Sequence, residues 1–244
     1  MTEDQSVRDA YYDTFSARYD DPRGAGYHRL VDDLELATLA PLAVGRRCLE
    51  VGCGTGLLLA RLAEEAAEAV GVDPSPGMRA RALERGLDAR PGTATALPFE
   101  DGRFELVYSM KVLAHVPELG AALEEMARVT APGGCVAFEL YNPLSLRYLA
   151  KRLAGPGVIG EEQGRRVTEA DIFTRWDAPW VLPRVLPAGL TLEAVHGVRV
   201  LTPAAFVHRL PAVGPLLRRA EHRARRSPLR WFGGFLVGVA RKAR

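Results

Sequence analysis

A run of glycines follows the first strongly apolar segment of the chain. The stretch reads LEVGCGTG from Leu49 to Gly56, with glycine at positions 52, 54 and 56. Glycine lacks a Cβ and tolerates positive φ, so such a loop lets a ligand lie directly against the backbone. Asp73 ends the next apolar run. A carboxylate about 20 residues after a glycine loop is typical of open α/β sheets, where it accepts hydrogen bonds from ribose hydroxyls. The pattern therefore predicts a pocket for an adenosine-like ligand.

Strand-like and helix-like segments alternate from residue 45 to 142. Short apolar runs predict strands at 48–53, 68–73, 104–113 and 135–142, and a strand with a loop at 87–99. Helical patterns separate them at 56–67, 76–86 and 118–130. Because parallel strands joined by helices form right-handed crossovers, we expect a doubly wound α/β fold.

The flanking segments predict elaborations of a single domain over residues 1–244. Residues 1–44 are expected to form an N-terminal helical lid, because an aromatic stripe runs through 7–21. Residues 45–142 are the predicted cofactor-binding core, and 143–177 a helical insertion that shapes the acceptor site. Residues 178–244 are expected to begin with a proline-interrupted helix and then to add basic helices and the last strands of the sheet.

Composition excludes several classes of protein. Of the 244 residues, 48% are hydrophobic and 25% are charged, which is usual for a globular chain. The polar N-terminus lacks a signal-type apolar stretch, and the apolar run at 231–240 is too short to span a membrane, so we expect a cytoplasmic protein. Three cysteines without C-x-x-C spacing and five scattered histidines predict neither a disulfide framework nor a metal site.

Charge is distributed unevenly along the chain. Residues 201–244 contain ten Lys or Arg and one acidic residue, Glu221, although the whole chain carries only +2. Such a basic segment is compatible with a solvated helix face, with peripheral contact to a membrane surface, or with a phosphorylated acceptor. No nucleic-acid partner is expected, because YNPL at 141–144 lacks the aromatic residue that would stack a flipped base.

The glycine spacing separates two classes of cofactor. Dinucleotide sites use G-x-G-x-x-G, whereas this chain has G-x-G-x-G preceded by Glu50. A carboxylate here would repel a pyrophosphate but suits a ligand with a cationic end, such as S-adenosylmethionine (SAM). A nicotinamide-dependent reductase is therefore disfavoured.

Four motifs in order resemble the class I SAM-dependent methyltransferases, in particular the type 11 small-molecule group. They are LEVGCGTG at 49–56, GVDPSPGM at 71–78, ALPFEDGRFELVYSMKVLAHV at 96–116 and ARVTAPGG at 127–134. The resemblance implies a Rossmann-like, seven-stranded, mostly parallel sheet, with 232–242 as its one antiparallel strand. It also implies SAM as the cofactor and S-adenosylhomocysteine as its product, without a metal.

The resemblance also implies which residues hold the cofactor. Gly52, Gly54 and Gly56 would lie under the methionine portion, with Glu50 near its amino end. Asp73 would take the ribose hydroxyls and Met78 would pack on the adenine. The remaining predicted cofactor contacts are Tyr19, Thr93, Ala94 and Ser109.

One position departs from the family pattern. Relatives read Gly-Asp-Ala where this chain reads Gly92, Thr93 and Ala94, so the carboxylate expected to meet the adenine amino group is absent. The Thr93 hydroxyl can still accept a hydrogen bond, so we expect weaker adenine recognition rather than none.

Methyl transfer requires alignment of the acceptor and removal of its proton. His115, just past the fourth strand, is the predicted general base. Residues expected to line the acceptor site are Tyr11, Tyr12, Lys111, Tyr141, Asn142, Arg175 and Trp176. The predicted function is methyl transfer to an oxygen, nitrogen or carbon atom of a small molecule, such as a secondary metabolite. The alternatives are a lipid, quinone or phosphorylated acceptor near a membrane, and a SAM-binding partner protein without catalysis.

Overall fold

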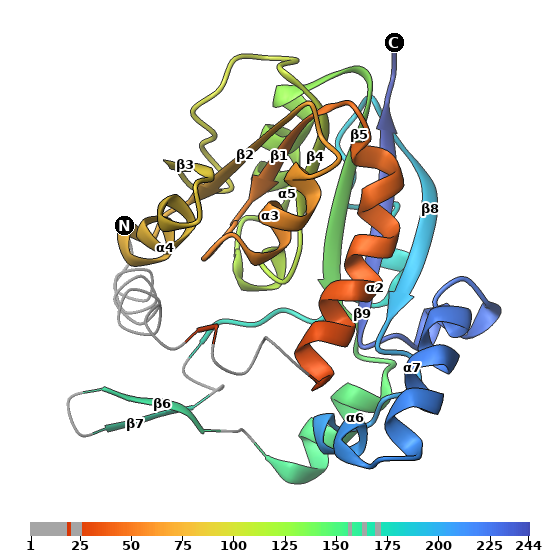
Figure 1. Cartoon of the computed structure of the whole chain (residues 1–244). Helices are drawn as coiled ribbons and strands as arrows, with labels where there is room; N and C mark the ends of the chain where they lie inside the picture. Colours follow the sequence, from red (N-terminus) through yellow and green to blue (C-terminus); the bar gives the residue numbers. More distant parts are fainter. Residues whose placement is uncertain (1–18, 21–25, 156–157, 163–164, 169–171) are drawn as a thin grey trace.

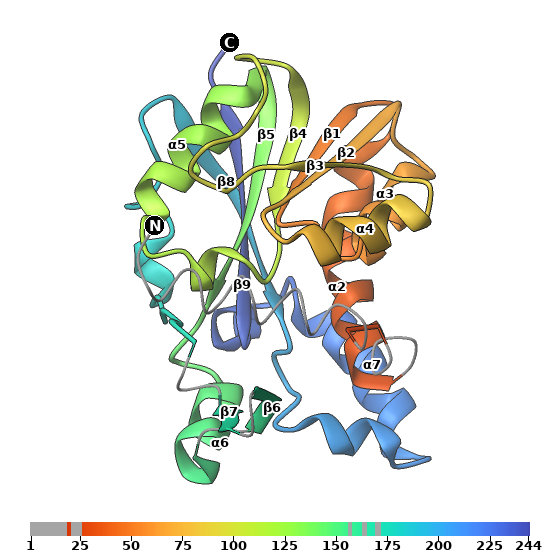
Figure 2. The same cartoon turned by 90° about the vertical axis from the view of Figure 1, so that its left-hand side faces the viewer.

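The apolar runs predicted as strands pair into one seven-stranded sheet, with the order β3-β2-β1-β4-β5-β9-β8 (Figures 1 and 2). The computed structural model describes residues 19–20, 26–155, 158–162, 165–168 and 172–244. The strands are β1 (Arg47–Val51), β2 (Glu68–Asp73), β3 (Asp88–Pro91), β4 (Phe104–Ser109), β5 (Thr130–Tyr141), β8 (Leu190–Val198) and β9 (Phe235–Lys242). Strand β9 pairs antiparallel with β5 and β8, whereas β1 to β5 pair in parallel. The predicted fold class is confirmed.

Helices cover both faces of the sheet, as a doubly wound fold requires. Figure 2 shows α2 (Gly26–Ala43), α3 (Leu57–Ala63) and α4 (Pro76–Glu84) on one side, and α5 (Leu119–Val129) on the other. Alternate residues of β1 supply the two layers: Leu49 belongs to the buried cluster of α5, and Cys48 to that of α2. Because both faces are covered, the central strands are mostly apolar on both faces rather than alternating, with Glu50 of β1 and Glu139 of β5 as buried exceptions.

Helix α2 lies inside the predicted lid but forms part of the core. Its Leu30, Leu34 and Leu39 are buried in the same cluster as residues of β1, β4 and β9. Only residues 19–20 of the aromatic segment that motivated the lid are described, and Tyr11 and Tyr12 lie outside the described residues. The lid itself therefore stays a prediction.

The insertion after β5 contains a hairpin as well as the expected helix. Helix α6 (Leu146–Ala154) is followed by the antiparallel pair β6 (Val158–Glu162) and β7 (Arg165–Thr168). The proline-interrupted helix expected after the insertion is wrong, because only a 3₁₀ turn, η4 (Pro179–Val181), forms there. Pro183 and Pro187 follow it closely, and each removes a backbone donor that a helix would need.

The C-terminal basic region is fixed to the rest of the fold by buried polar contacts. It comprises η5 (Ala205–Arg209), α7 (Val213–Ala224) and η6 (Pro228–Phe232). The fully buried Glu221 of α7 accepts hydrogen bonds from the backbone N–H groups of Val200 and Thr202 at 2.8 Å. Figure 1 shows α6 and α7 together beyond the carboxyl ends of the parallel strands. In the described part of the chain, no helix has the combination of length and hydrophobicity that a membrane span needs.

Candidate functional site

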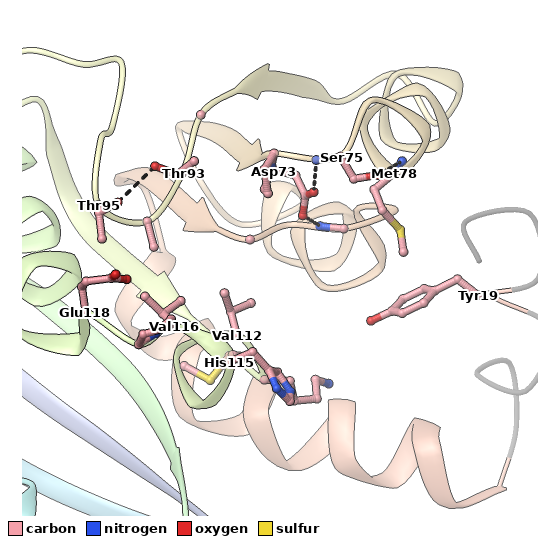
Figure 3. Close-up of a pocket in the computed structure, with 18 residues that line it drawn as sticks. Tyr19, Asp73, Ser75, Met78, Thr93, Thr95, Val112, His115, Val116 and Glu118 are labelled. Atoms are coloured by element: carbon pink, nitrogen blue, oxygen red, sulfur yellow. Dashed lines mark hydrogen bonds between the residues drawn. The ribbon is translucent and has the colours of Figure 1, made fainter. Parts of the chain in front are cut away.

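A pocket opens at the carboxyl ends of β1, β2 and β4, where the loops after these strands face one another (Figure 3). Its empty volume is about 1060 Å³, a figure that includes open solvent at the mouth. The predicted site residues that line it are Tyr19, Gly52, Gly54, Asp73, Met78, Thr93, Ala94, Lys111 and His115. The fold thus brings residues from separate sequence motifs together in one pocket.

The glycine loop after β1 has the conformation that its sequence predicts. Gly52, Gly54 and Gly56 have φ values of 77°, 55° and 81°, which L side chains rarely adopt. A Cβ on Gly52 would lie 2.4 Å from Val112 Cγ2, whereas one on Gly54 would meet nothing within 4 Å. Gly54 therefore leaves its backbone open to the pocket, while Gly52 and Gly56 are required by packing.

Asp73, at the end of β2, holds the glycine loop against the next helix. Its Oδ2 accepts a hydrogen bond from Gly54 N at 2.8 Å and its Oδ1 one from Ser75 N at 2.9 Å (Figure 3). Ser75 in turn caps α4 by accepting from Met78 N at 3.1 Å, which places Met78 on the pocket wall.

Glu50 lies one layer below the pocket surface. Its side chain is buried and accepts a hydrogen bond from Tyr108 Oη at 3.2 Å. Burial raises the pKa of Glu50 to about 8, and nearby Lys111 opposes part of this rise. Lys111 itself lies 2.7 Å from Asp32 and 2.9 Å from Glu35, both on α2. A cation arriving near Glu50 would favour its ionised form, so the site is suited to a ligand with a positive end.

The other end of the pocket is lined by the loop after β3. Thr93 Oγ1 lies 3.3 Å from Thr95 Oγ1, so the two hydroxyls are hydrogen-bonded to each other. Glu118, an exposed residue at the start of α5, lines the pocket opposite this loop (Figure 3). Sequence reasoning missed Glu118, although the missing carboxylate at position 93 was a reason to search for another.

His115 ends the 3₁₀ turn η2 (Leu113–His115) and is oriented by the insertion. Its Nδ1 lies 2.9 Å from Phe173 O, and a carbonyl can only accept, so we assign the proton to Nδ1. Thr174 Oγ1 is a second neighbour of Nδ1 at 3.3 Å. Nε2 then carries the lone pair and lies 3.4 Å from Tyr141 Oη. In this tautomer Nε2 is the basic nitrogen, and it faces the Tyr141 hydroxyl.

Several other predicted residues lie outside the described lining of the pocket. Arg175 pairs with Asp177 through two contacts of 2.7 and 2.8 Å. Asn142 is fully buried and donates to Trp231 O at 2.8 Å and Gly233 O at 2.9 Å. Ser109, also buried, donates to Val51 O at 2.8 Å. These side chains connect strands and loops behind the site.

An aromatic cluster supports the His115 side of the pocket. The Tyr141 ring lies 5.6 Å from those of both His115 and Trp176. The buried Arg147 guanidinium stacks on Tyr141 at 4.5 Å and on Trp176 at 4.9 Å. Tyr141 and Trp176 are therefore packed behind His115 rather than on the described lining.

The N-terminal segment reaches the pocket at Tyr19, whose side chain points inward (Figure 3). The adjacent Asp20 accepts a hydrogen bond from Thr55 Oγ1 at 2.7 Å and pairs with Arg85. Tyr19 is thus fixed beside the glycine loop. Sequence reasoning also missed Pro74, Ser75, Gly92, Thr95, Met110, Val112, Val116 and Pro117 in the lining. The described residues contain no cluster of side chains suited to a metal ion, and all three cysteines are buried and free.

Comparison with known proteins is consistent with this geometry. Residues 49–138 match the family model described as a methyltransferase domain. The chain is 34% identical over 155 residues to a ubiquinone biosynthesis O-methyltransferase of Azorhizobium caulinodans, covering 54% of this chain and 61% of that one. It is 38% identical over 148 residues to a malonyl-[acyl-carrier protein] O-methyltransferase of Halorhodospira halophila, covering 57% and 49%. The chain thus spans about half to three fifths of the length of these relatives.

Solved structures share the fold over nearly the whole chain. The DhpI–SAM–HEP complex superposes with a TM-score of 0.67 at 20% identity, covering 99% of each chain. A possible histamine N-methyltransferase of Thermotoga maritima superposes with a TM-score of 0.66 at 21% identity, covering 95% of this chain and 98% of that one. At these identities the likeness concerns the fold alone.

Proposed function

We propose that this chain, which resembles the class I SAM-dependent methyltransferases in its motifs and in the methyltransferase-domain match over residues 49–138, transfers the methyl group of SAM to a small-molecule acceptor in the pocket described above. The observation that carries the proposal is the open backbone of Gly54 beside the carboxylate of Asp73. This arrangement fits the hydroxyls and apolar edge of a nucleoside better than it fits a pyrophosphate.

The residues present suit each part of the cofactor. Gly52 and Gly54 would lie under the methionine portion, with Glu50 supplying negative charge beneath its ammonium group. Asp73 would accept from the ribose hydroxyls, and Met78 would pack against the adenine. Tyr19, held by Asp20 at the rim, would cover the cofactor from the solvent side.

Bound SAM supplies a methyl group on a sulfonium, which an acceptor nucleophile takes by in-line displacement. The chain would align the acceptor and receive its proton. His115 Nε2 is suited to that role because Phe173 O and Thr174 Oγ1 hold the proton on Nδ1. Met110, Val112 and Val116 provide apolar walls that would exclude water from the reacting groups.

We further propose that the acceptor atom is an oxygen. A neutral imidazole lone pair can accept the proton of a phenolic hydroxyl, whereas a carboxylate acceptor is already ionised and needs only alignment. The two relatives described above are both named as O-methyltransferases, one acting in ubiquinone biosynthesis and one on a malonyl carrier protein. Phenols of quinone precursors and carboxylates of short acyl groups are therefore the first acceptors to test.

The test of cofactor binding is calorimetry with SAM and S-adenosylhomocysteine. We expect micromolar binding by the unmodified protein and a loss of roughly a hundredfold in Asp73→Ala, because two charged hydrogen bonds disappear. Asp88→Ala on the neighbouring strand β3 is the matched control, since Asp88 is exposed and pairs with Arg90. Absence of binding at millimolar SAM, or equal affinity in Asp73→Ala, would overturn the assignment of the pocket.

A further inference from the structure

Helix α6 carries its apolar stripe on the outside of the molecule. Leu146, Leu149 and Leu153 follow the i, i+3, i+7 spacing of one helix face, and are 45%, 55% and 81% exposed. In a surface helix such a stripe normally faces the core. Here it faces away from the core.

The inward face of α6 explains this orientation. Arg147, only 9% exposed, places its guanidinium 4.5 Å from the ring of Tyr141 and 4.6 Å from that of Phe235. Ser145 caps the helix by accepting from Tyr148 N at 3.1 Å. The buried Arg147 and the Ser145 cap thus fix the rotation of α6 about its axis. In that orientation its leucines face the solvent.

These leucines form one wall of an open apolar groove. The opposite wall contains Leu229 and Phe232 of η6, which are 49% and 52% exposed. We define the leucine surface as Leu144, Leu146, Leu149, Leu153, Leu229 and Phe232, all of which line this groove. Contiguous apolar surface of this kind marks a site of contact with another protein or with a membrane.

Cations lie at the same end of the molecule as the leucine surface. Arg152 lines the groove itself. Helix α7, at this end (Figures 1 and 2), exposes Arg219 and Arg223, and Arg226, also exposed, follows it. An apolar surface with these cations suits a partner that has both an apolar interior and negative charge.

We propose that this end of the molecule docks on an anionic lipid bilayer. The leucine surface would enter the interfacial region, while the arginines would meet lipid phosphates. The combination of an apolar face and a basic patch is what stable peripheral attachment requires. Nucleic acid would satisfy the arginines but gain nothing from exposed leucines. Because α6 and α7 extend beyond the carboxyl ends of the parallel strands, docking would also bring the pocket's end of the sheet toward the bilayer (Figure 1).

Vesicle sedimentation with the full chain tests the proposal. We expect binding to vesicles of phosphatidylcholine with 30% phosphatidylglycerol, weak binding to phosphatidylcholine alone, and weakening in high salt. Leu149→Asp with Leu153→Asp should lower the partition coefficient at least about tenfold, because charges cannot replace buried methyl groups. Leu83→Asp is the matched control, since Leu83 is 56% exposed on α4, outside the leucine surface.

A second set of variants separates the electrostatic contribution. Reversal of Arg219, Arg223 and Arg226 to Glu should abolish the preference for anionic vesicles, since each cation near such a surface contributes roughly a fivefold factor. Arg81→Glu on α4 should leave the preference for anionic vesicles unchanged. Circular dichroism and calorimetry with SAM establish that the variants remain folded.

Two results would overturn the proposal. One is that the folded protein does not bind anionic vesicles, or that the variant with Leu149→Asp and Leu153→Asp binds them as well as the unmodified protein. The other is light scattering that shows a dimer dissociated by Leu149→Asp with Leu153→Asp, together with no vesicle binding, in which case a second copy covers the leucines.

Discussion

The two walls of the pocket are built differently. The wall formed by the loops after β1, β2 and β3 is held mainly over short spans of sequence, since Asp73 accepts from Ser75, two residues away, and from Gly54, 19 residues away. The wall after β4 depends on distant segments: Lys111 pairs with Asp32, 79 residues away, and His115 contacts Phe173, 58 residues away. The first wall is thus specified by local backbone conformation and the second by tertiary packing. Such a division would suit a first wall that binds the same cofactor in every case and a second wall that adapts to the acceptor.

Substitution of Gly52 should produce the largest effect, because the first wall depends on backbone conformation. Gly52→Ala combines a φ of 77° with a Cβ 2.4 Å from Val112 Cγ2, and the branched Val112 side chain has little freedom to withdraw. We expect loss of measurable SAM binding and a decrease of more than about 3 kcal/mol in the free energy of unfolding. Urea titration and calorimetry measure both.

Gly189→Ala provides the matched control for strain. Gly189 has a φ of 86°, but a Cβ there would meet nothing within 4 Å. This variant should lose about 1–3 kcal/mol from backbone strain alone and keep its affinity for SAM. If Gly52→Ala behaved like Gly189→Ala, the local conformation of the first wall would not matter to the cofactor.

A change at His115 tests the second wall. His115→Gln should lower kcat by about a hundredfold or more while leaving the affinity for SAM unchanged. The acidic limb of the pH–rate profile, which reports protonation of the base, should disappear. Tyr141→Phe should change the rate only a few-fold, because its hydroxyl lies 3.4 Å from Nε2. An unchanged rate in His115→Gln would mean that the second wall acts by alignment alone.

The sequence predicted the first wall better than the second for the same physical reason. Glycines, Asp73 and the apolar runs carry local information, so β1 to β5 and the glycine loop follow from the pattern. The partners of Lys111 depend on the packing of α2, which no motif identifies. The hairpin of the insertion and the exposed stripe of α6 likewise follow from tertiary contacts, such as the burial of Arg147 among aromatic rings.

The pH dependence of the free energy of unfolding tests the protonation of Glu50, which is buried beneath the pocket. Burial raises the pKa of Glu50 from 4.5 to about 8, so the folded state keeps a proton that the unfolded state releases. Between about pH 4.5 and 8 this group lowers stability as the pH rises, by up to about 1.4 kcal/mol per pH unit. Glu50→Gln keeps the contact with Tyr108 and removes this slope, so the variant should gain stability over the unmodified protein from pH 5 to 8.

Glu105→Gln should show the opposite sign. Its hydrogen bonds with Arg47 lower the pKa of Glu105, so its stabilisation is present above its unfolded pKa and is lost as the pH falls through the folded value. Urea titrations from pH 5 to 8 measure the Glu50 variant, and titrations continued below pH 4.5 measure the Glu105 variant. A difference between Glu50→Gln and the unmodified protein that did not vary with pH would mean that Glu50 is ionised in the fold.

The smallest expected effect lies at the adenine end, where the two walls meet. Thr93 stands where the family resemblance implies a carboxylate, and Glu118 from the second wall lines the pocket opposite it (Figure 3). We expect Thr93→Asp to raise the affinity for SAM about tenfold, through a hydrogen bond to a charged acceptor. Glu118→Gln should lower it several-fold in the unmodified protein, but not in the Thr93→Asp background, if both carboxylates serve the same amino group. A double-mutant cycle by calorimetry measures this coupling. If the two effects are simply additive, the two carboxylates act on the cofactor independently; if they are coupled, the second wall has taken over one contact that the first has lost.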